Sequence, residues 1–218
     1  IASKMWDQKV SIVVDCTGND GTQVFPYRLL VLLGNLAPEE MRLNCQGVYY
    51  YNISSGLFPN FFRNAKEGSN YFNQGRFEYY FPSARNDYKT ITNLGLPEET
   101  VRSYHDVRAK FTDASLYQVE QNRFVPVVVK IGSEYLQISQ TTPQRIKVKG
   151  VLKEIYLNDV FKLQQITAVA VSEKTGVPNE ITINFQSGRE IILSSPKSLD
   201  IMRLLYFTKN RATDSPTE

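Results

Sequence analysis

The chain has 218 residues, 25 basic and 22 acidic side chains, a formal net charge of +3, and 42% hydrophobic residues. This is an ordinary globular composition for one large domain or two small ones, and without a clear basic excess we expect no nucleic-acid partner. The two cysteines, Cys16 and Cys45, lie in no Cys-x-x-Cys or Cys/His cluster, which predicts no metal site and a reduced, cytoplasmic setting. No apolar run approaches the ~18 residues of a membrane span. Because the chain begins at Ile1 without methionine, we expect it to be a piece of a longer protein.

The first hundred residues alternate between strand and helix patterns. Residues 9–15 carry β-branched side chains on both parities, which is typical of a strand in a parallel sheet covered on both faces. Helical spacing predicts a helix at 24–36, and a second strand is expected at 47–53. A short apolar helix at 57–66 and a third strand at 77–81 follow. This order predicts parallel strands joined by right-handed crossovers.

After about residue 100 the pattern changes to short alternating strands. A helix from 97 to about 111 is expected as a connector. The expected strands are 124–131, 134–139, 145–148, 152–157, 166–171, 180–185 and 190–193. The chain then closes with an amphipathic helix, capped by Ser194 or Ser195 with Pro196 at its first position. Its expected apolar stripe is Leu199, Met202, Leu205 and Tyr206. About seven strands and one closing helix are the plan of a pleckstrin-homology (PH) domain.

Both halves carry a family resemblance. IVVDCTG, GVYYYN, the Phe-rich helix and FEYYF resemble the second half of a Sec14 (CRAL-TRIO) lipid-exchange domain. FVPVVVKIGSEYLQIS, EIYLNDVFKLQQI and the closing helix resemble the PH-like module that follows Sec14 in neurofibromin. The two modules in this order are similar to the Sec14-PH region of neurofibromin and its fungal counterparts, the Ira-type Ras GTPase-activating proteins. The resemblance implies that the front of the Sec14 domain is missing from this chain.

The resemblance implies a fold of the class α/β plus β. It places the C-terminal part of a Sec14-like lipid-binding domain at 1–96 and a helical linker at 97–122. A PH-like β-barrel with a C-terminal helix is implied at 123–212, followed by a tail at 213–218.

The end of the first strand raises the question of an active site. Asp15 is followed by Cys16, Thr17 and Gly18, so a carboxylate stands beside a thiol. A nucleophilic cysteine needs a nearby histidine, and the single histidine, His105, lies in the expected connector helix. We therefore expect Asp15 to accept backbone N–H groups and Gly18 to let the chain turn. A small α/β hydrolase that uses Asp15 is the alternative.

The Sec14 resemblance also implies a lipid site. Helix 57–66 looks like the lid helix that opens a cavity for the acyl chains of a phospholipid. The expected lipid-binding residues are Tyr49, Tyr51, Leu57, Phe58, Phe61, Phe62, Arg63 and Lys66. Strand alternation puts the two tyrosines on one face, and the phenylalanines share one helical stripe. Ordinary core packing is the alternative for the aromatic residues, and a solvated helix face is the alternative for Arg63 and Lys66.

The basic residues of the second half are distributed unusually for a PH domain. Phosphoinositide-binding PH domains resemble one another in a cluster of Lys and Arg across the first hairpin. Here VVVKIGSEYLQIS, taken as that hairpin, holds only Lys130 and one glutamate, so the usual headgroup site is expected to be missing. The basic group comes later, in RIKVKGVLK, and resembles a protrusion that leans on the lid helix. The expected lid contacts are Lys147, Lys149 and Lys153, and an exposed basic edge that discourages strand pairing is the alternative.

The resemblance implies a regulatory lipid-binding module of a Ras GTPase-activating protein. It would bind a glycerophospholipid, use no cofactor, perform no covalent chemistry and associate peripherally with a cytoplasmic membrane surface. Ras would be a partner only through a separate catalytic domain of the parent protein. A protein-interaction scaffold with a vestigial cavity is the alternative from a different functional class.

Overall fold

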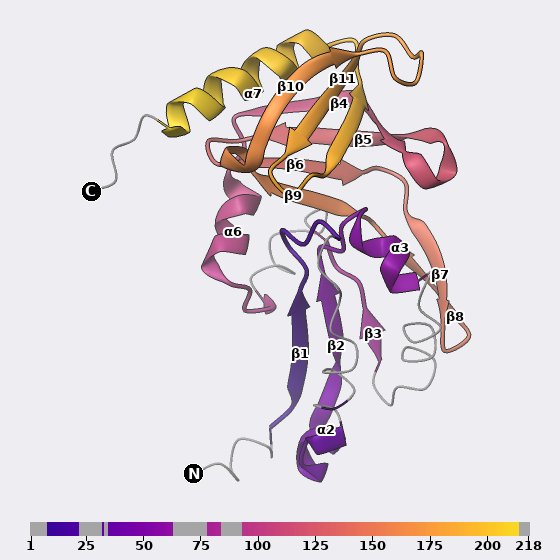
Figure 1. Cartoon of the computed structure of the whole chain (residues 1–218). Helices are drawn as coiled ribbons and strands as arrows, with labels where there is room; N and C mark the ends of the chain where they lie inside the picture. The colour runs from indigo at the N-terminus through magenta and orange to yellow at the C-terminus, as the bar shows by residue number, and fades with distance from the viewer. Residues whose placement is uncertain (1–7, 22–31, 33–34, 63–77, 84–92, 214–218) are drawn as a thin grey trace. The chain divides into compact units, whose positions relative to one another are not determined.

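A computed structural model describes residues 8–21, 32, 35–62, 78–83 and 93–213 (Figure 1). The chain divides into two compact units. The first comprises Ile1–Leu96 and Pro143–Leu157, and the second comprises Pro97–Thr142 and Asn158–Glu218. A segment that interrupts the sequence of the second unit therefore belongs to the first.

The first unit is built on a three-stranded parallel sheet in the order β1-β2-β3. Its strands are β1 (Val10–Asp15), β2 (Cys45–Tyr51) and β3 (Tyr79–Tyr80). The expected parallel pairing of these strands is confirmed. Strand β2 ends at Tyr51 rather than at residue 53 because Asn52 turns into the left-handed region, with φ of 54°.

Helices α2 and α3 lie within the described residues of the first unit. Helix α2 (Glu39–Asn44) was not indicated by the sequence pattern, and α3 (Leu57–Phe62) is the described part of the helix expected at 57–66. Most of the helix expected at 24–36 lies outside the described residues, as do positions 63–66. The start of α3 is set by Ser54, whose Oγ accepts the backbone N–H of Leu57 at 3.0 Å.

A two-stranded hairpin completes the first unit. Strands β7 (Gln144–Val148) and β8 (Val151–Ile155) pair antiparallel with each other and with no strand of either larger sheet. Lys149 and Gly150 both have positive φ, 49° and 81°, which is the geometry of a two-residue hairpin turn. The strands expected at 145–148 and 152–157 therefore form, but their expected place in the barrel is wrong. Val148 and Ile155 are instead buried in the core of the first unit.

The second unit holds a seven-stranded antiparallel sheet in the order β10-β11-β12-β4-β5-β6-β9. Its strands are β4 (Ala109–Gln118), β5 (Arg123–Ile131), β6 (Tyr135–Gln140), β9 (Asn158–Lys162), β10 (Ile166–Ser172), β11 (Glu180–Phe185) and β12 (Glu190–Ser194). Two 3-10 turns, Val119–Gln121 and Leu163–Gln165, lie between strands. A mostly antiparallel sheet followed by one C-terminal helix fits a PH-like fold. Strands β4 and β9, which the sequence pattern did not indicate, fill the places expected for the hairpin.

The segment expected to be a helical linker contains both a helix and a strand. Helix α6 (Glu98–His105) ends well before residue 111, and β4 begins at Ala109. The carboxylate of Asp106 accepts the backbone N–H groups of Ser133, Glu134 and Tyr135 at 2.6 to 3.0 Å. These bonds fix the chain to the β5–β6 turn directly after α6, so the helix cannot continue.

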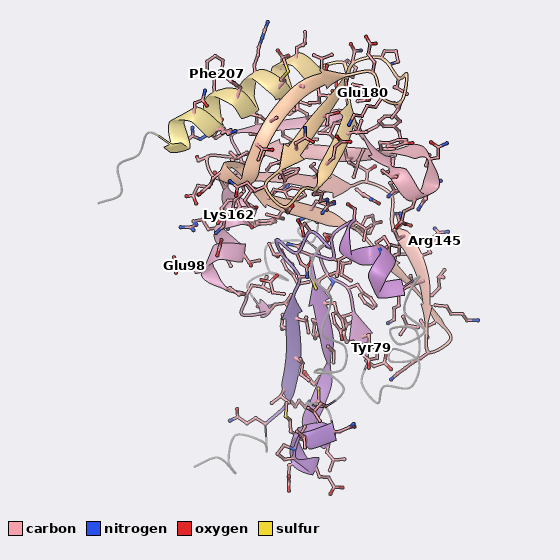
Figure 2. The ribbon with its side chains drawn as sticks, in the orientation of Figure 1. Tyr79, Glu98, Arg145, Lys162, Glu180 and Phe207 are labelled. Carbon is pink, nitrogen blue, oxygen red and sulfur yellow. The ribbon has the colours of Figure 1, made fainter. Side chains whose placement is uncertain are left out.

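The closing helix α7 (Ser198–Thr213) packs a different stripe on the sheet than expected. Ile201 and Leu205 are fully buried in the core of the second unit, whereas Leu199 is 52% and Tyr206 63% exposed. The expected stripe is wrong at Leu199 and Tyr206, while Leu205 is buried and Met202 half-buried as expected. Phe207 likewise lies on the exposed face of the helix (Figure 2). The expected cap is close to correct, because Ser195 Oγ accepts the backbone N–H of Lys197.

Candidate functional site in the first unit

The end of strand β1 is a hydrogen-bonded turn. Asp15 Oδ1 accepts the backbone N–H of Thr17 at 2.9 Å, and Gly18 has a positive φ of 76°, as the sequence predicts. The side chain of Asn52 donates to Thr17 Oγ1 at 3.0 Å and so connects this turn to the end of β2. The polar atoms at the strand end thus hold the loop together.

Cys16 is not suited to act as a nucleophile. Its side chain is buried, and its thiol lies 3.8 Å from the carbonyl of Val14. Burial raises the pKa of the Cys16 thiol to about 12, and the negative charge of Asp15 contributes to the increase. The reactive thiolate is therefore strongly disfavoured at neutral pH.

One face of the three-stranded sheet carries the apolar cluster of the first unit. Ile12 and Val14 on β1 stand beside Val48 and Tyr50 on β2, and Val48 is paired with Tyr79 on β3. The Tyr50 ring lies 6.3 Å from the Tyr79 ring and 6.0 Å from that of Phe81. This sheet face is therefore lined by aliphatic side chains together with aromatic rings.

Helix α3 belongs to the same cluster. Leu57 is fully buried there, and Phe58 packs against it partly buried. The side chains of Phe61 and Phe62 lie outside the described part of the structure, as do Arg63 and Lys66 altogether. Of the expected lipid-binding set, Leu57 and Phe58 are thus placed against the sheet face that carries Tyr50.

The two expected tyrosines lie on the opposite face. By strand alternation Tyr49 and Tyr51 point away from Tyr50, and Tyr49 stacks on Tyr80 with ring centroids 4.6 Å apart. Tyr51 is fully buried. Strand alternation therefore places these tyrosines on the sheet face opposite to Tyr50, and their role in lipid binding stays a prediction.

The β7–β8 hairpin contributes the remaining part of the cluster. Val148, Ile155 and Leu157 are buried in it, and Ile146 packs against it. The three residues share this cluster with Leu57 of α3. Sequence reasoning assigned the contact of the hairpin to its lysines and missed these apolar residues, although the alternation along RIKVKGVLKEI indicates an inward apolar face.

The hairpin lysines have contacts of their own. Lys149 Nζ lies 5.6 Å from the centre of the Tyr79 ring, and Lys153 Nζ lies 5.4 Å from that of Tyr80. Both distances are typical of cation–π contacts. Tyr79 and, on the hairpin, Arg145 are labelled in Figure 2. Lys147 is exposed on the other face of the hairpin. A contact between these lysines and the lid helix stays a prediction.

The basic residues of the antiparallel sheet need one correction. Because β4 precedes β5, the first hairpin of this sheet is β4–β5, and the segment VVVKIGSEYLQIS forms the second. Lys130 faces Lys110 across β4 and β5, and burial together with the charge of Lys110 lowers the pKa of Lys130. The turn of the first hairpin carries Glu120 and Arg123, so no cluster of basic residues stands at this turn either.

Within the described ranges, no three His, Cys, Asp or Glu side chains are grouped as a metal ion requires. None of the helices in the described part combines the length and the apolar character needed to cross a membrane.

Known proteins similar to this chain come from yeast. No protein-family model matches it. The chain is 32% identical over 213 residues to the inhibitory regulator protein IRA2 of Saccharomyces cerevisiae, which covers 97% of this chain and 7% of that protein. The inhibitory regulator protein IRA1 of the same yeast is 30% identical over 211 residues, with coverage of 96% and 7%. Nearly the whole chain thus resembles one small segment of these relatives.

A solved structure, the N-terminal PH domain of human ARAP2, is 13% identical and matches 50% of this chain and 85% of that domain. Its TM-score of 0.37 is too low to establish a shared fold.

Proposed function

We propose that this chain is a lipid-binding regulatory module of a longer protein that restrains Ras signalling. In this proposal the first unit is the C-terminal part of a Sec14-like domain and holds a glycerophospholipid, with α3 as its lid. The β7–β8 hairpin, inserted from the PH-like part of the sequence, sets the position of that lid. GTPase activation and the contact with Ras belong to other parts of the longer protein.

The observation that carries the proposal is the shared cluster of α3 and the hairpin. Leu57 of α3 and Val148 and Ile155 of the hairpin are buried in one apolar core on the sheet. Any outward movement of α3 therefore exposes apolar surface of the hairpin as well, at about 25 cal/mol per Å². A shift of the hairpin would in turn weaken the packing of α3, so the hairpin can hold the lid closed.

The similarity to the yeast proteins supports the regulatory part of the proposal. Both relatives are named inhibitory regulators, and this chain matches about 7% of their length. The order of a parallel sheet followed by an antiparallel sheet with a closing helix agrees with the Sec14-then-PH order. The proposed role is that of a non-catalytic module, placed at the cytoplasmic membrane surface without crossing it.

The apolar lining of the first unit suits an acyl chain. Removing one CH₂ from water contributes about 0.8 kcal/mol, so a long acyl chain supplies roughly ten kcal/mol of gross transfer free energy. The tyrosine and phenylalanine rings around α3 offer apolar surface of that kind. We place the acyl chain between α3 and the sheet when the lid is open.

Native mass spectrometry of the parent protein, purified from cells without detergent, tests this proposal. We expect a bound mass equal to that of a glycerophospholipid, released on denaturation. A second measurement is lipid exchange between vesicles after Phe61 and Phe62 are both changed to serine. We expect exchange to fall strongly, while the control Leu43→Ser, on the exposed side chain of α2, leaves it unchanged. A protein without bound lipid, whose exchange is indifferent to both changes, contradicts the proposal.

A protein-interaction scaffold is the second candidate, and one observation favours it. Tyr50, Tyr51 and Leu57 are all fully buried by protein, so the described sheet faces are already covered. A scaffold would keep this packed arrangement and use the outer surfaces to bind a partner. Lost partner binding with unchanged lipid exchange in the Phe61/Phe62 variant would favour the scaffold.

A further inference from the structure

The β7–β8 hairpin concentrates the net charge of the chain. Residues 144–155 contain four basic side chains, Arg145, Lys147, Lys149 and Lys153, against the single carboxylate of Glu154. The resulting charge of +3 equals the formal net charge of the whole chain, +3. The remaining sequence is therefore neutral on balance, and the hairpin is a strongly electropositive segment of the chain.

The carboxylate of Glu154 forms an ion pair with Arg145, at a distance from the hairpin turn. Glu154 Oε1 lies 3.2 Å from Arg145 Nε across the two strands, so these two charges offset each other. The three lysines lie nearer the turn. Lys149 and Lys153 rest over tyrosine rings, which orient the ammonium groups but leave their positive charge in place.

Two apolar side chains project among these lysines. Val151 is 55% exposed and Leu152 is 62% exposed, directly after the Lys149-Gly150 turn. Val151 is paired with Val148, and Leu152 with Lys147, so the two apolar side chains lie on opposite faces of the ribbon. The fold of the first unit does not need them, because its core uses Val148 and Ile155 of the same hairpin.

The form of this tip suits a lipid surface better than a protein. A stable protein interface covers roughly 800 Å² per partner, far more than two side chains at a narrow turn supply. A bilayer accepts a narrow apolar wedge in its headgroup region and attracts nearby lysines to acidic lipids. Tyr80, which is partly exposed beneath Lys153, adds an aromatic ring of the type enriched at membrane interfaces.

We propose that the tip of the β7–β8 hairpin docks on an anionic membrane surface. Val151 and Leu152 enter the headgroup region, and Lys147, Lys149 and Lys153 meet the acidic headgroups around them. This inference deepens the proposed lipid-binding function and rests on its peripheral membrane role. Because the hairpin and α3 share one apolar cluster, docking of the tip would couple contact with the bilayer to the position of the lid.

Co-sedimentation of the 218-residue chain with vesicles tests the docking site. Vesicles of phosphatidylcholine alone are compared with vesicles that also contain phosphatidylserine. We expect binding to the anionic vesicles only, weakened by added salt because screening shortens the reach of the lysine charges. Lys147→Glu should weaken this binding at least about fivefold, since each basic residue near an anionic surface is worth about that factor.

Leu152→Asp tests the apolar wedge, and it should reduce binding at low and at high salt. Both altered side chains lie on the outer face of the hairpin, so the thermal unfolding of the variants should match that of the unaltered chain. Val119→Asp is the matched control, because Val119 is also an exposed apolar residue at a turn, between β4 and β5. It should leave vesicle binding unchanged.

The proposal is overturned if the chain ignores anionic vesicles, or if both hairpin variants bind them as the unaltered chain does. It is also overturned if only Val119→Asp abolishes binding, which would assign docking to the β4–β5 turn. A chain that binds no vesicle at all makes an acidic protein surface the next partner to examine. Native mass spectrometry distinguishes the two proposals. If the protein carries no bound lipid but still docks on vesicles through the hairpin, only the proposed lipid cavity is contradicted.

Discussion

The two compact units of this chain bury different side chains in different ways. The second unit packs aliphatic residues and the tilted ring pair of Phe161 and Phe185 with its own closing helix. The first unit adds two tyrosines and a cysteine to its aliphatic residues, and it takes part of its core from the β7–β8 hairpin, which is distant in sequence. A three-stranded parallel sheet needs cover on its faces, and a short sheet has few residues of its own to provide it. The hairpin is therefore packed into the core of the unit it covers, and we expect it to contribute to the stability of that unit.

The largest effect is expected from a change confined to the second unit. Asp159 is buried and forms an ion pair at 2.9 Å with Arg189, which is itself mostly buried and lies over the Phe161 ring. Asp159→Ala would leave a buried guanidinium without its counter-charge and cost about 3–5 kcal/mol of unfolding free energy. Hydrogen exchange measured by mass spectrometry should show the loss of protection in β9, β11 and β12. Equal loss in β1 and β2 would show that the two units unfold together.

The next prediction tests to which unit the hairpin belongs. Ile155→Ala removes a buried side chain from the first unit and should cost about 2–5 kcal/mol. Protection should fall in β1 and β2 and stay unchanged in β5 and β6. Ile138→Ala, at an equally buried position of β6, is the matched control and should show the reverse. If Ile155→Ala lowered protection in β6 and β9 instead, the assignment of the hairpin would be wrong.

The sequence predicted the parallel strands because their apolar runs are continuous, and it located the strands of the hairpin by their alternation. It could not indicate that the hairpin forms a sheet separate from the seven-stranded one, because tertiary packing decides which strands pair. Strand β4 was missed because the apolar residues of AKFTDASLYQ do not alternate regularly, and only Ala114 and Leu116 are buried. Strand β9 begins with Asn158 and Asp159, which are turn-forming residues by composition.

The stripe of α7 shows a second limit of sequence reasoning. The segment SLDIMRLLYF offers two overlapping apolar stripes at helical spacing, and periodicity does not distinguish them. The structure buries Ile201 and Leu205 and leaves Leu199 and Tyr206 exposed. At the candidate site the same limit applies: alternation separates Tyr49 from Tyr50 correctly, but only packing reveals which face α3 covers.

An intermediate effect is expected for the carboxylate that stops α6. Burial would raise the pKa of Asp106, but three backbone N–H donors outweigh burial and hold it below its usual 3.8. A lowered pKa in the folded state means stability that is present above pH 3.8 and lost as the pH falls through the lower folded value. Asp106→Asn should cost about 1–3 kcal/mol at neutral pH and flatten the loss of stability in acid. Urea unfolding of the second unit at several pH values measures both. An unchanged acid dependence would show that another carboxylate controls it.

The smallest effect on stability is expected for the outer face of the hairpin, in contrast to its buried inner face. The side chains of Arg145 and Glu154 form an ion pair while 66% and 45% exposed, so solvent screens their attraction. Arg145→Gln should therefore change the unfolding free energy of the first unit by no more than about 0.5 kcal/mol. Thermal unfolding of the Arg145→Gln and Ile155→Ala variants compares the two faces within one hairpin. If Arg145→Gln lowered the unfolding free energy as much as Ile155→Ala, the outer face of the hairpin would also stabilise the fold. Its basic side chains would then have a structural role, which argues against a role reserved for membrane binding.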